Sequence, residues 1–145
     1  MKRILVAIDG SPRAAYVLQT AAKMATQSGA KLILVRAVGI VLELPPEVLL
    51  DSPDHVAQIA LNLARAAVET AIKGLDAAIV ERIETRIGSP WQVICDLATS
   101  EKVDLIVVGT HGYSGIDHVL GTTAARIVNH APCSVLVVRA TESSE

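Results

Sequence analysis

Aromatic residues are scarce in this chain of 145 residues: phenylalanine is absent, and the aromatic side chains are Tyr16, Trp91 and Tyr113. Proteins that bind single-stranded nucleic acid stack bases on several exposed aromatic rings, so this scarcity disfavours that class. The basic surplus of nucleic-acid-binding domains is also missing, because 13 Lys and Arg stand against 15 Asp and Glu. At a net charge of −2 we expect neither nucleic acid nor an anionic membrane as a partner.

Cysteine is equally rare. The chain has Cys95 and Cys133 and no CxxC pair, which argues against a disulfide scaffold and against a zinc site. No apolar run approaches the length of a membrane span, and no hydrophobic leader precedes the first strand-like residues. These absences predict a protein of the reducing cytoplasm.

What the chain has in quantity is Ala, Val, Leu and Ile, within a hydrophobic content of 51%. We expect one domain over residues 1–145, with 140–145 as a frayed polar tail. Short apolar runs, typical of strands buried on both faces, occur at 2–8, 31–38, 104–108 and 134–139. Residues 78–87 alternate between apolar and charged, which predicts a half-exposed strand at a sheet edge.

Helical patterns separate these strands. Ser-Pro pairs at 11–12, 52–53 and 89–90 predict three helices, each with Ser as the N-cap and Pro in the first turn. The first ends at Ser28-Gly29, and a fourth helix is expected at about 122–129. The second is expected to bury Val56, Ala60, Leu63, Ala67 and Ala71. The alternation predicts an α/β fold: five parallel strands with helices on both faces.

Ligands of such sheets bind beyond the carboxyl ends of the strands, where the winding reverses. Two polar, glycine-bearing loops qualify: Asp9-Gly10-Ser11 and residues 109–123. Gly121-Thr122-Thr123 lies at a helix start, where backbone N–H groups favour an anion. The loop is therefore a candidate phosphate cradle, although glycine is also common in loops after parallel strands. Because GxxxxGK[ST] is absent and no GxGxxG follows the first strand, a Walker A loop and a dinucleotide fold are disfavoured.

Three segments carry a family resemblance: KRILVAIDGS at 2–11, DLIVVGTHG at 104–112 and GTTAARIVNHAPCSVLVVR at 121–139. Through them the chain resembles the universal stress proteins over nearly its whole length. The resemblance implies a Rossmann-like open sheet in the strand order 3-2-1-4-5. It also implies a homodimer, paired through the last strand, Ser134 to Arg139.

Many members of that family bind ATP through Gly, two residues, Gly, nine residues, then Gly and Ser or Thr. Carried over to this chain, Gly109, Gly112, Gly121 and Thr122 would hold the ribose and phosphates, with Thr123 beside them. Here, however, eight residues separate Gly112 from Gly121. One residue fewer changes the reach of the loop by up to ~3.5 Å.

The resemblance also implies roles at two other strand ends. Ala7 and Asp9 would lie beside the nucleotide, with Asp9 also near its Mg²⁺, and the main chain at Ala37 would meet the adenine. The expected ligand is ATP or AMP, and the expected function is a regulatory switch that an unknown protein partner reads. Two alternatives stay open: an interaction module of the same fold without nucleotide, and a slow ATP hydrolase. The hydrolase is disfavoured because the loop holds neither a Lys nor a convincing base.

Several residues have plainer interpretations. Asp9 could simply cap the adjoining helix. His111, Asp117 and His118 are interpreted as exposed loop residues rather than metal ligands, and Arg126 as part of a solvated face. Cys95 is expected in the core, and Trp91 is expected to pack.

The apolar residues of two further segments have separate interpretations. In the 39–51 connection they suggest a lid folded onto the sheet rim, or alternatively a cover for a ligand or partner. In the last strand, the uninterrupted apolar run Val135 to Val138 would leave a bare sheet edge. Such an edge invites pairing with a second chain, which is the basis of the dimer hypothesis.

Overall fold

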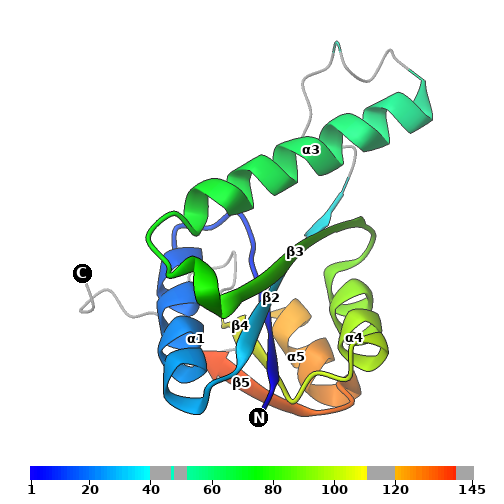
Figure 1. The fold of residues 1–145 in the computed structure, drawn as a ribbon. Helices are drawn as coiled ribbons and strands as arrows, with labels where there is room; N and C mark the ends of the chain where they lie inside the picture. Colours follow the sequence, from blue (N-terminus) through cyan, green and yellow to red (C-terminus); the bar gives the residue numbers. More distant parts are fainter. Residues whose placement is uncertain (40–46, 48–51, 111–119, 140–145) are drawn as a thin grey trace.

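Short runs of β-branched residues and leucine form one parallel sheet in the order β3-β2-β1-β4-β5 (Figure 1). The computed structural model describes residues 1–39, 47, 52–110 and 120–139. Its elements are β1 (Arg3–Ala7), α1 (Ala14–Ser28), β2 (Lys31–Val38), α3 (Pro53–Ala71), the 3-10 helix η2 (Ala77–Ile79), β3 (Val80–Ile87), α4 (Pro90–Ser100), β4 (Leu105–Gly109), α5 (Thr122–His130) and β5 (Ser134–Val138). The predicted fold class, strand order and edge position of β3 are confirmed.

Helices cover both faces of the sheet because successive strand residues point to opposite sides. In β1, Ile4 and Val6 belong to the cluster that includes the buried face of α1, whereas Leu5 packs with residues of α4 and α5. All three side chains are fully buried. This places β1 at the centre of the fold, between β2 and β4.

The first helix begins later than the Ser11-Pro12 pair predicts. Arg13 is the N-cap of α1, no side chain caps the helix, and the first helical residue is Ala14. The Asp9 carboxylate accepts a hydrogen bond from the Ser11 N–H (2.9 Å), and the Ser11 carbonyl accepts one from Ala14 (3.1 Å). A turn therefore occupies the positions assigned to the first helical turn. The interpretation of Ser11 as the helix cap is wrong, and the alternative of a capping role for Asp9 is not observed either. The predicted end is confirmed, since Gly29 adopts φ +76° at the C-cap.

The other two Ser-Pro pairs do open helices. Ser52 caps α3, and its hydroxyl accepts a hydrogen bond from the His55 N–H (3.3 Å). Ser89 occupies the N-cap position of α4 without a side-chain capping bond.

The buried face of α3 differs from the prediction. Val56, Ala60, Ala64 and Val68 are buried, whereas Leu63, Ala67 and Ala71 are exposed. Ala and Leu occur on both sides of this helix, so their spacing did not determine which stripe faces the sheet. Figure 1 shows the N-terminal half of α3 reaching beyond the end of β3, and there Val56 and Ala60 pack on Val38.

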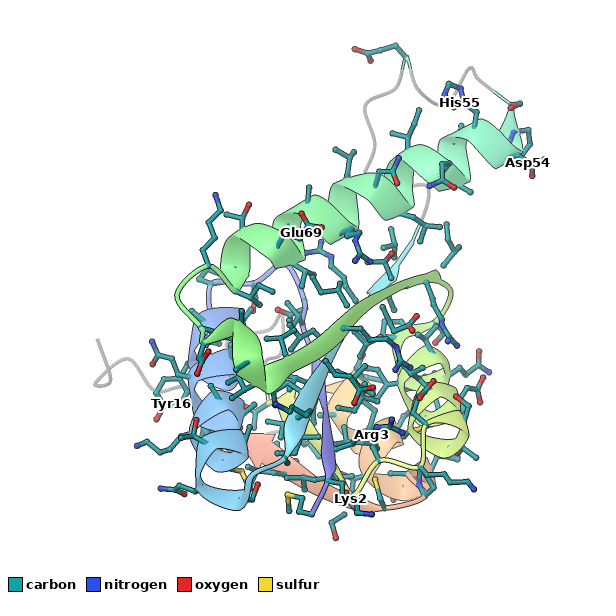
Figure 2. The ribbon with its side chains drawn as sticks, viewed as in Figure 1. Lys2, Arg3, Tyr16, Asp54, His55 and Glu69 are labelled. Atoms are coloured by element: carbon teal, nitrogen blue, oxygen red, sulfur yellow. The ribbon has the colours of Figure 1, made fainter. Side chains whose placement is uncertain are left out.

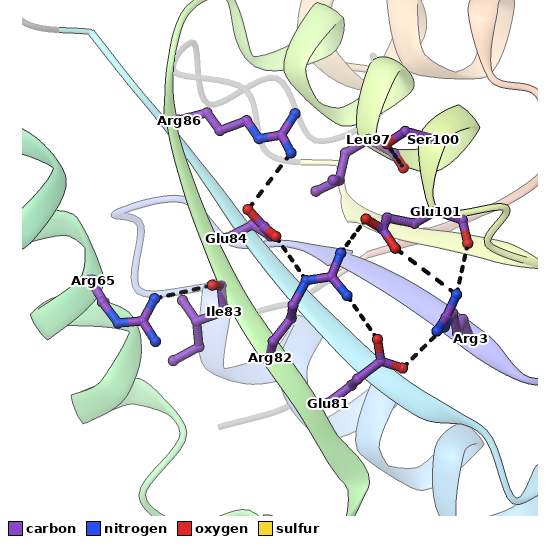
Figure 3. A network of polar contacts seen from close by, with 10 residues as sticks. All are labelled: Arg3, Arg65, Glu81, Arg82, Ile83, Glu84, Arg86, Leu97, Ser100 and Glu101. Atoms are coloured by element: carbon purple, nitrogen blue, oxygen red, sulfur yellow. Dashed lines mark hydrogen bonds and ion pairs between the residues drawn. The ribbon is translucent and has the colours of Figure 1, made fainter.

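A network of ion pairs covers one face of the edge strand β3 (Figure 3). Arg82 is bonded to Glu81 and Glu84 at 2.8 Å each and to Glu101 at the C-cap of α4. Arg3 joins Glu81 at 3.1 Å, which ties the edge strand to the N-terminus of β1. These charges blunt an exposed strand edge against pairing with another chain.

Asp104 connects β4 to the start of β1. Its Oδ2 accepts hydrogen bonds from the backbone N–H groups of Lys2 (2.6 Å) and Arg3 (3.0 Å), and Figure 2 shows these two residues at one end of the sheet. The hydrogen bond from Arg3, then that from Lys2, lowers the pKa of Asp104 below its ordinary value.

A lowered pKa makes stability depend on acidity. The ionised carboxylate favours the folded chain above an unfolded pKa of about 3.9, and this advantage is lost as the pH falls through the lower folded value. We expect Asp104→Asn to lower the unfolding temperature at pH 6 and to approach the wild-type value near pH 2. Thermal unfolding followed by circular dichroism from pH 2 to 6 measures this, and a difference independent of pH would contradict it.

Some expectations lie outside the described residues: the lid within 39–51, apart from Gly39 and Glu47, and the tail 140–145. In the part of the chain that the structure describes, no helix is both long and apolar enough to cross a bilayer.

Candidate functional site

The two polar loops follow neighbouring strands. β1 and β4 pair in parallel, with Leu5 opposite Ile106 and Val6 opposite Val107. From their carboxyl ends the chain continues to opposite faces of the sheet: α1 covers one face and α5 the other. This is the topological switch point, where open α/β sheets bind their ligands. The prediction that the Asp9 loop and the loop after Gly109 start side by side is confirmed.

The first loop contains a buried hydroxyl without a partner. Ser11 Oγ is inaccessible to solvent and has no hydrogen-bond partner among the described residues. An unsatisfied buried polar group costs about 1–3 kcal/mol. Since Ser11 is not the helix cap, its hydroxyl contributes nothing to the start of α1.

This geometry reverses the sign expected of a mutation. A capping serine would lose about 0.5–2 kcal/mol on replacement by alanine. We instead expect Ser11→Ala to raise the free energy of unfolding by about 1 kcal/mol, because it removes an unpaired hydroxyl. Urea unfolding measures this change in the free energy of unfolding. Ser52→Ala is the matched control, because it removes a serine that does cap a helix and should therefore be destabilised. A destabilised Ser11→Ala protein would restore the capping interpretation.

The second loop leads into the N-terminus of α5. Gly121 is the N-cap, with φ −61° and ψ 156°, and as a glycine it has no side chain with which to cap the helix. Thr122, the first helical residue, is exposed and Thr123 is half-buried. The first N–H groups of any helix have no partner within it. The structure thus places Gly121, Thr122 and Thr123 at a helix start, and anion binding there stays a prediction.

The remaining predicted residues lie at three strand ends. Ala7 ends β1 and Gly109 ends β4, and both are half-buried, as is Ala37 near the end of β2. The pairing of β1 with β2 continues past Ala7, since the Ile8 N–H donates to the Val35 carbonyl at 2.9 Å. Gly112 lies outside the described residues. The described part of the predicted set thus gathers at one edge of the sheet.

Arg36 is a neighbour of this set that the sequence reasoning missed. A Cβ atom built on Gly10 would lie 3.2 Å from Arg36 Nη2 and 3.8 Å from its Cζ, so the guanidinium rests against Gly10. The signal was present: Arg36 is a lone charge within the otherwise apolar run from Leu32 to Val38. It was overlooked because the run was interpreted only as a strand.

The profile of the universal stress protein family matches residues 1–139. A curated relative, "Universal stress protein A homolog 1" of Coxiella burnetii, is 36% identical over 143 residues, which cover 94% of this chain and 95% of that protein. The chain belongs to the universal stress protein family.

Solved structures of universal stress proteins share its fold. The protein UspA from Lactobacillus plantarum superposes with a TM-score of 0.75 at 26% identity, covering 95% of this chain and 97% of that one. A universal stress protein solved in complex with cAMP has a TM-score of 0.64 at 26% identity, covering 97% and 98% of the two chains. The Rossmann-like sheet expected from the resemblance is therefore shown.

Two other groups have structural roles in this universal stress protein. Cys95 is buried and Cys133 half-buried, and burial raises the pKa of both thiols, which disfavours the reactive thiolate.

Trp91 packs against His130, with ring centroids 4.7 Å apart, and the exposed Arg126 lies 5.9 Å from the centre of the Trp91 ring. The packing role predicted for Trp91 is confirmed.

The described residues contain no group of three His, Cys, Asp or Glu side chains that could hold a metal ion. His111, Asp117 and His118 lie outside them.

Proposed function

We propose that this universal stress protein binds an adenine nucleotide, ATP or AMP, at the carboxyl edge formed by β1, β2 and β4. The observation that carries the proposal is that Asp9, Ala37 and Gly109 lie at the carboxyl ends of the adjacent parallel strands β1, β2 and β4, the edge of the sheet at which α5 begins. The universal stress protein in complex with cAMP supports the ligand class, since cAMP is an adenine nucleotide. The phosphates would lie at Gly121, Thr122 and Thr123, where the helix N-terminus favours negative charge.

A Mg²⁺ ion would enter with the nucleotide. Magnesium keeps several waters and is held by substrate phosphates together with one or two carboxylates. Among the described residues of the site, Asp9 offers a suitable carboxylate, whose Oδ1 is fixed by the Ser11 N–H. The residues therefore fit a phosphate-bound ion better than a resident metal. Asp9 would orient that ion beside the nucleotide.

The same proposal assigns the protein to a cytoplasmic homodimer that acts as a switch. The nucleotide would bind one of two surface states more tightly and so shift the population that a protein partner reads. The two copies would pair through β5, whose outer edge has no partner among the described strands.

Thermal unfolding of the purified chain with Mg-ATP, AMP and GTP tests the proposal. Stabilisation by the adenine nucleotides and not by GTP is the expected result. No stabilisation at millimolar nucleotide would overturn it. The shorter spacing from Gly112 to Gly121 would then be the reason, and a nucleotide-free interaction module would become the better account.

A further inference from the structure

We propose that Arg36 forms one wall of the purine pocket and stacks its guanidinium on the bound base. This inference rests on the proposed function and adds to it the residue that recognises the base. It starts from the contact between Arg36 of β2 and Gly10 of the β1–α1 loop.

The position of Arg36 follows from the sheet. Val35 lies opposite Ala7 in the parallel pairing of β1 and β2, so Arg36 is level with the end of β1. Leu34 faces the α1 side and Val35 the α4 side, and the alternation directs Arg36 to the α1 side. From there its guanidinium reaches forward to Gly10, beside Asp9. A side chain at Gly10 would crowd this contact, since its Cβ would lie 3.2 Å from Arg36 Nη2.

Strand spacing places the base near this guanidinium. Neighbouring strands lie about 4.8 Å apart, so the ends of β4 and β2 are separated by roughly 10 Å, with β1 between them. A nucleotide whose phosphates lie at the start of α5 must cross the end of β1. Its base then arrives at the end of β2, where Arg36 and Ala37 are.

Among the described side chains near the switch point, the guanidinium of Arg36 is the planar group on which a base can stack. Described residues around the switch point are small or aliphatic, with no aromatic ring among Ala7–Ser11, Ala37–Gly39, Gly109–Thr110 and Leu120–Thr123. Arginine presents a planar, weakly hydrated cation that stacks on aromatic faces, as lysine does not. Such a contact is worth a factor of roughly 2 to 30 in affinity.

Calorimetric titration of adenosine and AMP into the full chain tests the assignment. Arg36→Ala is expected to weaken both ligands by the same factor, roughly 2- to 30-fold. Arg36→Lys should restore only part of the affinity, because the lysine ammonium keeps the attraction of a cation to the ring and loses the planar stacking surface. Arg65→Ala is the matched control: it removes an exposed arginine of α3 that pairs with Glu69 at 3.2 Å, and this variant should bind like wild type.

The outcomes separate this assignment from the function beneath it. If the wild-type chain binds neither adenosine nor AMP, the proposed function is contradicted, and with it the assignment of Arg36 to the purine pocket. If wild type binds and Arg36→Ala binds equally well, the assignment alone is overturned. A loss confined to AMP would make Arg36 a phosphate ligand, which also overturns it. Urea unfolding of each variant excludes a loss of fold as the cause of weaker binding.

Discussion

Mg-ATP at about 100 times its dissociation constant is expected to raise the unfolding temperature of this protein by roughly 5–11 °C. A ligand that binds only the folded chain at that ratio adds about 2.7 kcal/mol to its stability. For a domain of this size, each kcal/mol corresponds to about 2–4 °C. AMP should act similarly and GTP should not, if the site is selective for adenine.

Gly121→Val is expected to abolish that rise. With φ −61° and ψ 156°, the backbone of Gly121 is extended and within reach of any residue, so glycine is not required there for conformation. A side chain at this N-cap would instead occupy the space through which a phosphate approaches the first N–H groups of α5. Since valine is a poor N-cap, the unliganded variant should lose about 1 kcal/mol while remaining folded.

Gly74→Val is the matched control for Gly121→Val. Gly74 lies in the connection from α3 to η2, and a Cβ built there would meet no atom within 4 Å. This variant should keep the full response to Mg-ATP. If Gly121→Val still responds to Mg-ATP like wild type, the phosphates do not bind at the start of α5.

Replacing Val137 by lysine is expected to convert a dimer into a monomer. β5 lies at the sheet edge, and Val135, Leu136 and Val137 are only half-buried, whereas the central strand β1 is buried at Ile4, Leu5 and Val6. Burying these side chains across a two-fold seam would add apolar contact at about 25 cal/mol per Å². Two lysines at such a seam would each lose water and repel one another.

Sedimentation equilibrium at micromolar concentration measures the association. We expect wild type at twice the 15.3 kDa chain mass and Val137→Lys near the chain mass itself. Ile87→Lys is the control, because it puts the same charge on an exposed residue at the opposite edge strand and should leave the dimer intact. A wild-type monomer would contradict the hypothesis, and circular dichroism verifies that the lysine variant is folded.

Much of the fold follows from the order of residues along the chain. Strands buried on both faces require unbroken apolar runs, and helices alternating with them require a parallel sheet. The pattern of residues 104–108 therefore predicted β4 to within one residue. The location of the site was predictable for the same reason, because Asp9 and Gly109 directly follow apolar runs and so lie at carboxyl strand ends.

Other features depended on contacts between residues that are distant in the sequence or that compete locally. Ser11 has the residue type and the following proline of a helix cap, yet the Asp9 carboxylate holds its N–H in a turn and the helix begins at Ala14. The stripe of α3 that is buried was set by packing on β2 and β3, since apolar residues lie on both sides of it.

The contact of Arg36 with Gly10 illustrates why the periodicity of a sequence does not predict contacts between residues on different strands. The two residues are brought together by the pairing of β1 with β2, and neither position alone indicates a partner. Local patterns report which residues prefer to be buried and where the chain turns. The strand register and the docking of helices determine which polar groups come into contact at the edge of the sheet. In this protein those contacts define the candidate site.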